Sequence, residues 1–341
     1  MKIIITGGSG FIGSNFIIKQ LMTNKHSLLN IDKLTYAGIS ENLISAKKDR
    51  NYKFVNGDIR DKNLIYEIIN SFKPDAIINF AAESHVDRSI DSPMDFIQTN
   101  VVGTANLINE AYIYWEKSNN KKFRFLHIST DEVYGSLGDS GFFDELTPYN
   151  PSSPYSASKA SSDHIVRAWF HTYKMPILIT NCSNNYGPYQ FPEKLIPLII
   201  TNCINEIELP VYGDGLNVRD WIYVEDHCEA IMNVLNNGVP GETYNIGANK
   251  EIRNIEIINK ICSILDIKKP RKNKKSYKKL IKYIKDRPGH DYRYAIDSSK
   301  IRENLGWKPK ETFESGIHKT IDWYIKNERW WKNIQKNAST Y

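Results

Sequence analysis

The chain opens with Lys2-Ile3-Ile4-Ile5-Thr6-Gly7-Gly8-Ser9-Gly10-Phe11-Ile12-Gly13, and this stretch decides the fold. Its apolar run predicts a buried strand, and the glycines that follow have the spacing of a dinucleotide-binding turn. Such glycines permit a tight turn, a close approach of the backbone to a pyrophosphate, and close packing of helix on strand. Alone the loop is a weak signal, because an ordinary strand-to-helix turn looks similar.

Asp32 strengthens the signal, because it stands about 20 residues further on, at the end of the next predicted strand. A carboxylate there can bind both ribose hydroxyls and would repel a 2′-phosphate, which favours NAD over NADP. The neighbouring Lys33 is positively charged, and this weakens the preference for NAD over NADP. Asp58-Ile59 follows the third predicted strand, and Asp58 either caps the adenine or is the N-cap of the helix that starts at Asp61.

Short β-rich runs alternate with helical patterns in the first half of the chain. The predicted strands are 3–6, 28–32, 52–56, 76–80, 123–129 and 177–182, and the helices between them include 11–22, 61–71, 94–115 and 156–173. This order predicts an α/β fold, a Rossmann-type doubly wound parallel sheet with helices on both faces. We expect an NAD-binding domain over 1–183, to which segments near 213–247 return. A smaller α/β substrate-binding lobe would occupy 184–341, with helices at 193–203, 225–235 and 254–265.

Composition excludes few functions but sets limits. The chain has 341 residues, 41% of them hydrophobic, and can bury a sizeable core. Its net charge of +6 fits anionic ligands and does not require nucleic acid.

No apolar run approaches the roughly 20 residues that span a bilayer. The first residues predict a strand rather than a signal peptide, so we expect a cytoplasmic protein. No C-x-x-C occurs, so neither a metal site nor disulfides are expected from Cys182, Cys203, Cys228 and Cys262.

The segment 268–285 is rich in lysine and arginine. A nucleic-acid patch is one interpretation. No aromatic stacking platform or binding motif accompanies the charges, so a solvated face that steers an anionic substrate is the preferred one.

Two further motifs carry chemical groups: Ser129-Thr130-Asp131-Glu132 and Tyr155-Ser156-Ala157-Ser158-Lys159. Tyr155 and Lys159 share one helix face, so the ammonium is expected to lower the pKa of Tyr155 and make it a base for a sugar hydroxyl. Two adjacent carboxyls push their pKa values apart, which leaves one acid and one base for eliminating water. Alternatively, Asp131 and Glu132 merely cap the loop, and the Tyr/Lys spacing is a common helical pattern.

With these motifs the chain resembles the extended short-chain dehydrogenase/reductase family. Along nearly its whole length it is similar to the dTDP-glucose 4,6-dehydratases within that family. In the related 4-epimerases and decarboxylases other residues usually replace the Asp-Glu pair, so the resemblance points to a dehydratase. The matching segments are 81–89, 129–135, 181–189, 192–197, 219–221 and 286–291.

The resemblance implies a cycle on a tightly bound NAD that is recycled. Tyr155 takes the proton of the hydroxyl on sugar carbon 4, Thr130 bonds the same hydroxyl, and Lys159 holds the cofactor ribose. Glu132 then removes the proton on carbon 5 while Asp131, kept protonated, gives its proton to the departing hydroxyl of carbon 6. Hydride finally returns to carbon 6. The product would be dTDP-4-keto-6-deoxyglucose, for deoxysugar biosynthesis such as a dTDP-rhamnose pathway.

The resemblance also assigns binding residues. Arg219 is expected on the pyrophosphate, through bidentate contact, and the 286–291 loop over base and ribose. Besides Tyr155 and Lys159, the NAD site comprises Gly7, Gly10, Phe11, Ile12, Gly13, Asp32, Lys33, Thr35, Asp58, Ile59, Ala81, Ala82, Thr99 and Asn185. Besides Thr130, the nucleotide-sugar site comprises Ser84, Asn184, Lys194, Leu195, Pro210, Val211, Tyr212, Arg219, Asn254, Asp286, Arg287 and His290.

In this family the helices over 94–115 and 156–173 form a four-helix dimer interface, so a homodimer is expected, although their apolar faces could equally be core. The rivals of the same fold are a UDP- or GDP-sugar 4,6-dehydratase and a 4-epimerase. A more remote rival is a non-catalytic NAD-binding protein. The pair Asp131-Glu132 argues against an epimerase, and Tyr155 with Lys159 argues against a non-catalytic protein.

Overall fold

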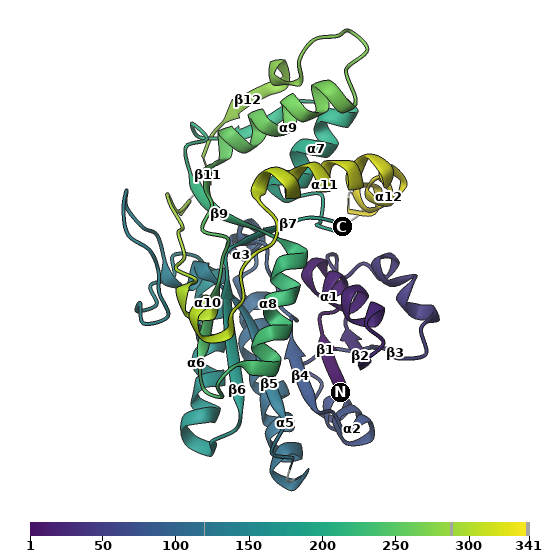
Figure 1. The fold of residues 1–341 in the computed structure, drawn as a ribbon, viewed down its shortest axis with the longest axis vertical. Coiled ribbons are helices and arrows are strands. Elements are labelled where there is room, and N and C mark those ends of the chain that lie inside the picture. Colours follow the sequence, from purple (N-terminus) through teal and green to yellow (C-terminus); the bar gives the residue numbers. More distant parts are fainter. Residues whose placement is uncertain (119, 287–288, 339–341) are drawn as a thin grey trace.

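A seven-stranded sheet forms the centre of the molecule (Figure 1). The computed structural model describes residues 1–118, 120–286 and 289–338. Neighbouring strands all run parallel, in the order β10-β6-β5-β4-β1-β2-β3, so the expected doubly wound sheet is confirmed. The strands are β1 (Lys2–Thr6), β2 (Ser27–Asp32), β3 (Tyr52–Asn56), β4 (Ala76–Asn79), β5 (Arg124–Thr130), β6 (Ile177–Cys182) and β10 (Thr243–Ile246).

Helices cover both faces of this sheet because successive side chains of its strands point to opposite sides. Ile3 and Ile5 pack in one buried cluster with Phe16, whereas Ile4 packs in another with Leu107. The first cluster lies under α1 (Phe11–Met22), α8 (Val224–Asn237) and α10 (Ser299–Leu305). The second lies under α2 (Lys62–Phe72), α5 (Thr104–Ser118) and α6 (Pro154–Tyr173).

A smaller lobe stands over the carboxyl ends of these strands and confirms the expected α/β lobe (Figure 1). It has its own buried core, which includes Trp221, Ile257 and Trp331. Its sheets are β11-β9-β7 and β12-β8. The elements are β7 (Asn184–Tyr186), α7 (Leu195–Asn205), β8 (Leu209–Tyr212), β9 (Val218–Tyr223), β11 (Glu251–Arg253), α9 (Asn254–Lys268), η5 (Tyr277–Leu280), β12 (Ile281–Ile284), α11 (Phe313–Lys326) and α12 (Glu328–Ala338).

The single helix predicted over 94–115 is divided in the structure. Its first turn is α4 (Pro93–Phe96), and a π-helical segment, η3 (Ile97–Gly103), precedes α5. The Asn100 side chain bonds both the N–H and the C=O of Glu83, at 2.9 and 3.0 Å, and donates to Ser158 Oγ at 2.8 Å. This wide turn therefore ties the loop after β4 to α6, as π-bulges often do at functional sites. The remaining short elements are η1 (Ser40–Leu43), η2 (Ala46–Lys48), α3 (Val86–Asp91) and η4 (Asp131–Tyr134).

Several charges of the basic segment 268–285 are paired within the lobe. Lys268 pairs with Asp322, Lys269 with Glu328, and Arg271 with Glu206. In the described part of the chain, no helix combines the length and the apolar character that crossing a bilayer requires.

Candidate active site

The glycine loop between β1 and α1 forms one wall of a cleft at the carboxyl edge of the sheet. Gly7 has a φ of +70° and its N–H donates to Ile31 O at 2.9 Å. A Cβ at Gly13 would lie 2.6 Å from Gly7 O, so the loop and the first turn of α1 pack too closely for any side chain there. The first residues of α1, Phe11, Ile12 and Gly13, line this cleft, and the first N–H groups of a helix have no partner within it, which suits a pyrophosphate.

Asp32 ends β2 with its carboxylate fixed in the cleft. Its Oδ2 accepts from Ser9 N and its Oδ1 from Leu34 N, both at 2.8 Å. Burial raises the pKa of Asp32, and the two backbone N–H groups oppose that rise. The Nζ of Lys33 lies 3.0 Å from Asp58 Oδ2. The positive charge that weakened the preference for NAD is therefore balanced by Asp58.

Asp58 is not the cap of the following helix. Asp61 holds that position, with its Oδ1 3.1 Å from Leu64 N, so the N-cap interpretation of Asp58 was wrong. Asp58 instead binds Arg60 and Lys33. Burial would raise the pKa of Asp58, but its bonds with Arg60 and the nearby Lys33 lower it, so the group is ionised.

The acidic pair follows directly from the end of β5, in the turn η4. Thr130 Oγ1 caps this turn by accepting from Glu132 N at 3.3 Å, and lies 3.4 Å from Asp131 Oδ1. Asp131 is 1% exposed, and among the described residues its Oδ2 has no hydrogen-bond partner. Burial raises the pKa of Asp131 well above its ordinary value, and Glu132 and Asp220 add to the rise. This shift favours the protonated form of Asp131.

Tyr155 and Lys159 lie in the first turns of α6, where the sequence placed them. A capping box between Ser153 and Ser156, with Pro154 at the first helical position, starts the helix just before Tyr155. The two side chains are 8% and 3% exposed. Lys159 Nζ donates to Ile128 O at 2.8 Å, which anchors the ammonium beside β5.

The expected lowering of the Tyr155 pKa is wrong for the chain without ligands. Burial raises the pKa of Tyr155 well above its ordinary value, and the charges of Glu132 and the Cys182 thiolate would add to the rise. A hydrogen bond with Thr130 opposes it. Lys159 makes no hydrogen bond to Tyr155 among the described residues, because its Nζ is turned toward Ile128 O.

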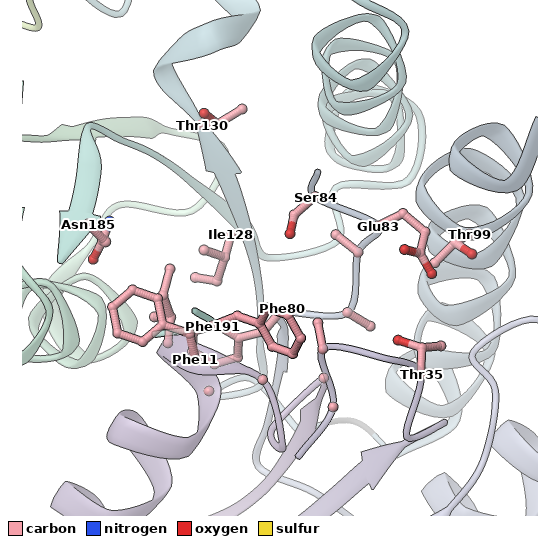
Figure 2. Close-up of a pocket in the computed structure, with 18 of the residues that line it drawn as sticks. Phe11, Thr35, Phe80, Glu83, Ser84, Thr99, Ile128, Thr130, Asn185 and Phe191 are labelled. Carbon is pink, nitrogen blue, oxygen red and sulfur yellow. The ribbon is translucent and has the colours of Figure 1, made fainter. Parts of the chain in front are cut away.

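The cleft brings the expected NAD residues and the catalytic set together. Figure 2 shows Thr35, Glu83 and Thr99 on one side of the cleft, and Asn185 on the other, with Thr130 at the end of its strand. The expected residues that line it are Gly7, Gly10, Phe11, Ile12, Gly13, Asp32, Lys33, Thr35, Asp58, Ile59, Ala81, Ala82, Ser84, Thr99, Thr130, Asp131, Glu132, Tyr155, Lys159, Asn184, Asn185 and Lys194.

The other expected nucleotide-sugar residues lie outside this cleft lining, in the smaller lobe. Arg219 donates to Asp291 O at 2.8 Å, and its guanidinium stacks 4.3 Å from the centre of the Tyr294 ring. His290 Nδ1 lies 2.7 Å from Asp286 Oδ1. The expected nucleotide-sugar residues outside the cleft lining are Leu195 at the start of α7, Pro210, Val211 and Tyr212 in β8, Arg219 in β9, Asn254 at the start of α9, and Asp286 and His290 after β12. Arg287 lies outside the described residues.

Sequence reasoning missed three residues of the cleft lining, Tyr36, Phe191 and Glu193. The Arg88 guanidinium lies 3.6 Å from the centre of the Tyr36 ring, and the Phe191 ring lies 5.5 Å from the same ring. Glu193 lies 3.6 Å from His85 Nε2. Tyr36 follows Thr35, which was assigned to the NAD site, and Glu193 lies within the matching segment 192–197. The signal that could have found both residues is their position beside residues already assigned.

The cleft has a volume of about 320 Å³, which lies within the roughly 300–1,000 Å³ of small-molecule pockets. Asn184 Oδ1 is a buried acceptor in its lining with no hydrogen-bond partner among the described residues. Because buried polar atoms are normally paired, such an acceptor suits a ligand.

Comparison with known proteins gives consistent matches over nearly the whole chain. Residues 4–320 match the family model described as GDP-mannose 4,6 dehydratase. A dTDP-glucose 4,6-dehydratase from Escherichia coli is 55% identical over 352 residues, covering 99% of this chain and 97% of that protein. The chain is also similar to solved structures of two dTDP-glucose 4,6-dehydratases. One is from Bacillus anthracis in complex with NAD (TM-score 0.87, 46% identity, 98% of this chain and 99% of that one). The other is from Streptomyces venezuelae with NAD and TYD bound (TM-score 0.89, 43% identity, 98% and 100%).

Proposed function

The chain belongs to the dTDP-glucose 4,6-dehydratase family, and from that premise we propose that it converts dTDP-glucose to dTDP-4-keto-6-deoxyglucose. The enzyme is an NAD-dependent nucleotide-sugar 4,6-dehydratase that serves deoxysugar biosynthesis. The observation that carries the assignment is the buried Asp131, with its raised pKa, beside Glu132 and in the same cleft as Tyr155 and Lys159. An oxidation alone needs Tyr155 and Lys159, whereas loss of water also needs the acidic pair.

The residues that hold NAD in this proposal are the glycine loop, Asp32 and Lys159. The N-terminus of α1 attracts the pyrophosphate, and the Asp32 carboxylate accepts from the ribose hydroxyls. A bound NAD would supply the acceptor for the hydride of sugar carbon 4 and the donor of that hydride to carbon 6, and its positive charge would favour the tyrosinate. Because the hydride comes back, the reaction has no net redox change.

Tyr155 is the proposed base for the hydroxyl on carbon 4. Its pKa is high in the chain alone, so the Lys159 ammonium and the Thr130 hydroxyl must stabilise the tyrosinate when ligands expel the remaining water. This role of Thr130 is supported by its opposition to the rise of the Tyr155 pKa.

The elimination of water uses the two carboxyls in different protonation states. Glu132 takes the proton from carbon 5, which the neighbouring ketone has acidified, and gives it back to carbon 5 when the hydride returns to carbon 6. The raised pKa of Asp131 favours its protonated form, which gives its proton to the departing hydroxyl of carbon 6. Two like charges in one pocket separate their pKa values in this way, so the adjacent positions serve as one acid and one base.

A comparison of nucleotide sugars tests the substrate. The purified protein is incubated with dTDP-, UDP- and GDP-linked sugars, and the 4-keto-6-deoxy product is followed by its absorbance in alkali. Turnover of dTDP-glucose is expected. Turnover of only a UDP- or GDP-linked sugar would sink the substrate assignment, and interconversion at carbon 4 without dehydration would indicate an epimerase.

We also propose that the enzyme is a homodimer that pairs through a four-helix bundle of α5 and α6 from each copy. Apolar side chains are exposed beside these helices, on α4, η3 and the end of α6, namely Met94, Ile97, Val102 and Tyr173. A second copy of the chain is the simplest cover for such a face.

We propose the cytoplasm as the compartment of the enzyme, where unpaired thiols such as those of Cys182, Cys203, Cys228 and Cys262 are the rule.

A further inference from the structure

One carboxylate is buried behind the cleft, beneath the helix that carries Tyr155 and Lys159. Asp163 stands one helical turn after Lys159, and its side chain has no exposed surface. Its Oδ2 accepts from Ser129 Oγ at 2.9 Å, from Tyr149 OH at 2.8 Å and from Asn181 Nδ2 at 3.3 Å. These donors come from β5, from the segment before α6 and from β6. Asp163 therefore joins the helix to both strands that border the cleft.

The imidazole of His127 lies between Asp163 and Lys159. Its Nε2 is 3.4 Å from Asp163 Oδ1 and 3.4 Å from Lys159 Nζ. On the other side of the ring, Nδ1 lies 3.1 Å from Asn79 Nδ2, and Asn79 Oδ1 accepts from Thr6 Oγ1 at 2.6 Å. The bond with Thr6 fixes the orientation of the amide, so Asn79 donates to Nδ1. With the ring proton on Nε2, His127 can donate to Ser162 Oγ at 3.2 Å, and Asp163 Oδ1 lies 3.4 Å from the same nitrogen.

The charges in this interior are few. Lys159 is 3% exposed, and its Nζ donates to the neutral Ile128 O and forms no ion pair with any described residue. Burial lowers the pKa of Lys159, and the charge of Asp163 opposes that fall. Arg167 reaches Asp163 only through Tyr149 OH, to which it donates at 2.6 Å.

We propose that Asp163 is a positioning residue that supplies the counter-charge of Lys159, with the neutral His127 ring held between the two. A buried ammonium is strongly disfavoured unless an opposite charge balances it. The inference rests on the function proposed above, because it explains how Lys159 stays charged beside Tyr155. The titratable groups that face Asp163 are His127, Lys159, Arg167 and Tyr149, and Cys182 faces Lys159.

The first test is the pH dependence of turnover in Asp163→Asn, which keeps the shape of the side chain and removes its charge. Without the counter-charge Lys159 loses its proton more readily, so the alkaline limb of the kcat profile should move down by about one pH unit or more. Tyr149→Phe is the matched control, because it removes one donor to the same oxygen and keeps the carboxylate. Its alkaline limb should stay in place. An equal fall of kcat at every pH in Asp163→Asn would mean a structural role only and would overturn the proposal.

The second test reads folding and not activity, so it separates this inference from the proposed function. In a Lys159→Met background, Asp163→Asn should lower the thermal midpoint less than it does in the natural chain, because no ammonium is left to balance. Equal losses in both backgrounds contradict the proposal. Should Asp163→Asn alone fail to fold, a folded double variant supports the proposal and an unfolded one overturns it. If the natural chain is inactive on dTDP-glucose, the proposed function is wrong. The comparison of thermal midpoints between the single and double variants still tests the role of Asp163.

Discussion

Asp131 and Glu132 are adjacent in the chain but lie in different surroundings. Asp131 is 1% exposed at the floor of the cleft, and Asp220 and Glu132 repel its charged form. Glu132 is only half-buried at the cleft surface. The strand-to-turn geometry that Thr130 caps sends two neighbouring carboxyls to sites of different polarity. That difference supports the proposed roles of Asp131 as the acid and Glu132 as the base.

Glu132→Gln should therefore separate oxidation from elimination. The amide cannot take the proton from carbon 5, so water loss is expected to slow by about 10²–10⁴-fold. Tyr155 is unchanged, so reduced cofactor should still form. Stopped-flow absorbance of the nicotinamide reports the first step, and the alkali absorbance of the keto sugar reports the second. Glu67→Gln, an exposed position on α2, should behave like the natural chain. Normal dehydration by Glu132→Gln would show that Glu132 is not the base that takes the proton from carbon 5.

The position of Tyr155 could be predicted from sequence, but its electrostatics could not. The Ser153 capping box and the four-residue spacing to Lys159 are local, and they fix which helix face the pair shares. The pKa of Tyr155 instead depends on burial and on Glu132 and Cys182, which other elements bring close. Likewise, the raised pKa of Asp131 depends on Asp220, 89 positions away in the numbering. Such effects need the tertiary structure.

Among the elements, those with strong local patterns were predictable. The helix expected over 11–22 is observed with the same bounds, because Gly10 and the apolar spacing fix its start and its buried face. Two features had no local signal. The π-helical turn at η3 arises from the contacts of Asn100 with Glu83 and Ser158. The parallel pair β8–β12 joins segments about 70 residues apart.

At the start of α1, Gly13→Ala should disrupt the cofactor site. The added Cβ would lie 2.6 Å from Gly7 O and 2.7 Å from Gly8 Cα, and neither backbone atom can move without displacing the loop. We expect a loss of about 1–3 kcal/mol in stability and NAD affinity at least about tenfold lower. Titration calorimetry and thermal unfolding measure the two effects. Gly138→Ala, whose Cβ would meet nothing within 4 Å, is the control and should change neither. Unchanged NAD affinity in Gly13→Ala would contradict the close packing.

Across the whole molecule, two fully buried histidines link stability to pH. Burial lowers the pKa of His127 to about 4 and that of His227 to about 3. Between pH 6.5 and these values the unfolded chain takes up protons that the folded chain does not. Stability from these groups is thus complete above pH 6.5 and falls as the pH decreases toward 4.

The free energy of unfolding should accordingly be lower at pH 5 than at pH 7, by about 2 kcal/mol for each of the two histidines. His227→Gln should remove one of these contributions and make the difference smaller. His318→Gln is the control, because the His318 side chain is 43% exposed. Urea unfolding of each protein at both pH values gives the comparison. A difference in His227→Gln as large as that of the natural chain would refute the linkage.

Association is the other property of the whole molecule, and the exposed apolar face beside α5 and α6 gives its test. Val102 in η3 is 44% exposed, and Ile97 in the same segment is 41% exposed. If this face is the dimer interface, Val102→Lys buries an unpaired ammonium there, which costs several kcal/mol.

Sedimentation equilibrium of the natural chain should therefore give twice the 39.4 kDa of the monomer. Val102→Lys should give a species near the monomer mass at the same concentration. Ile267→Lys introduces the same charge at an 84% exposed apolar residue of α9, and it should remain dimeric. Because Val102 does not line the cleft, a dissociated but folded variant should keep its NAD affinity. A dimeric Val102→Lys would exclude this face, and dissociation of Ile267→Lys would move the interface to the smaller lobe.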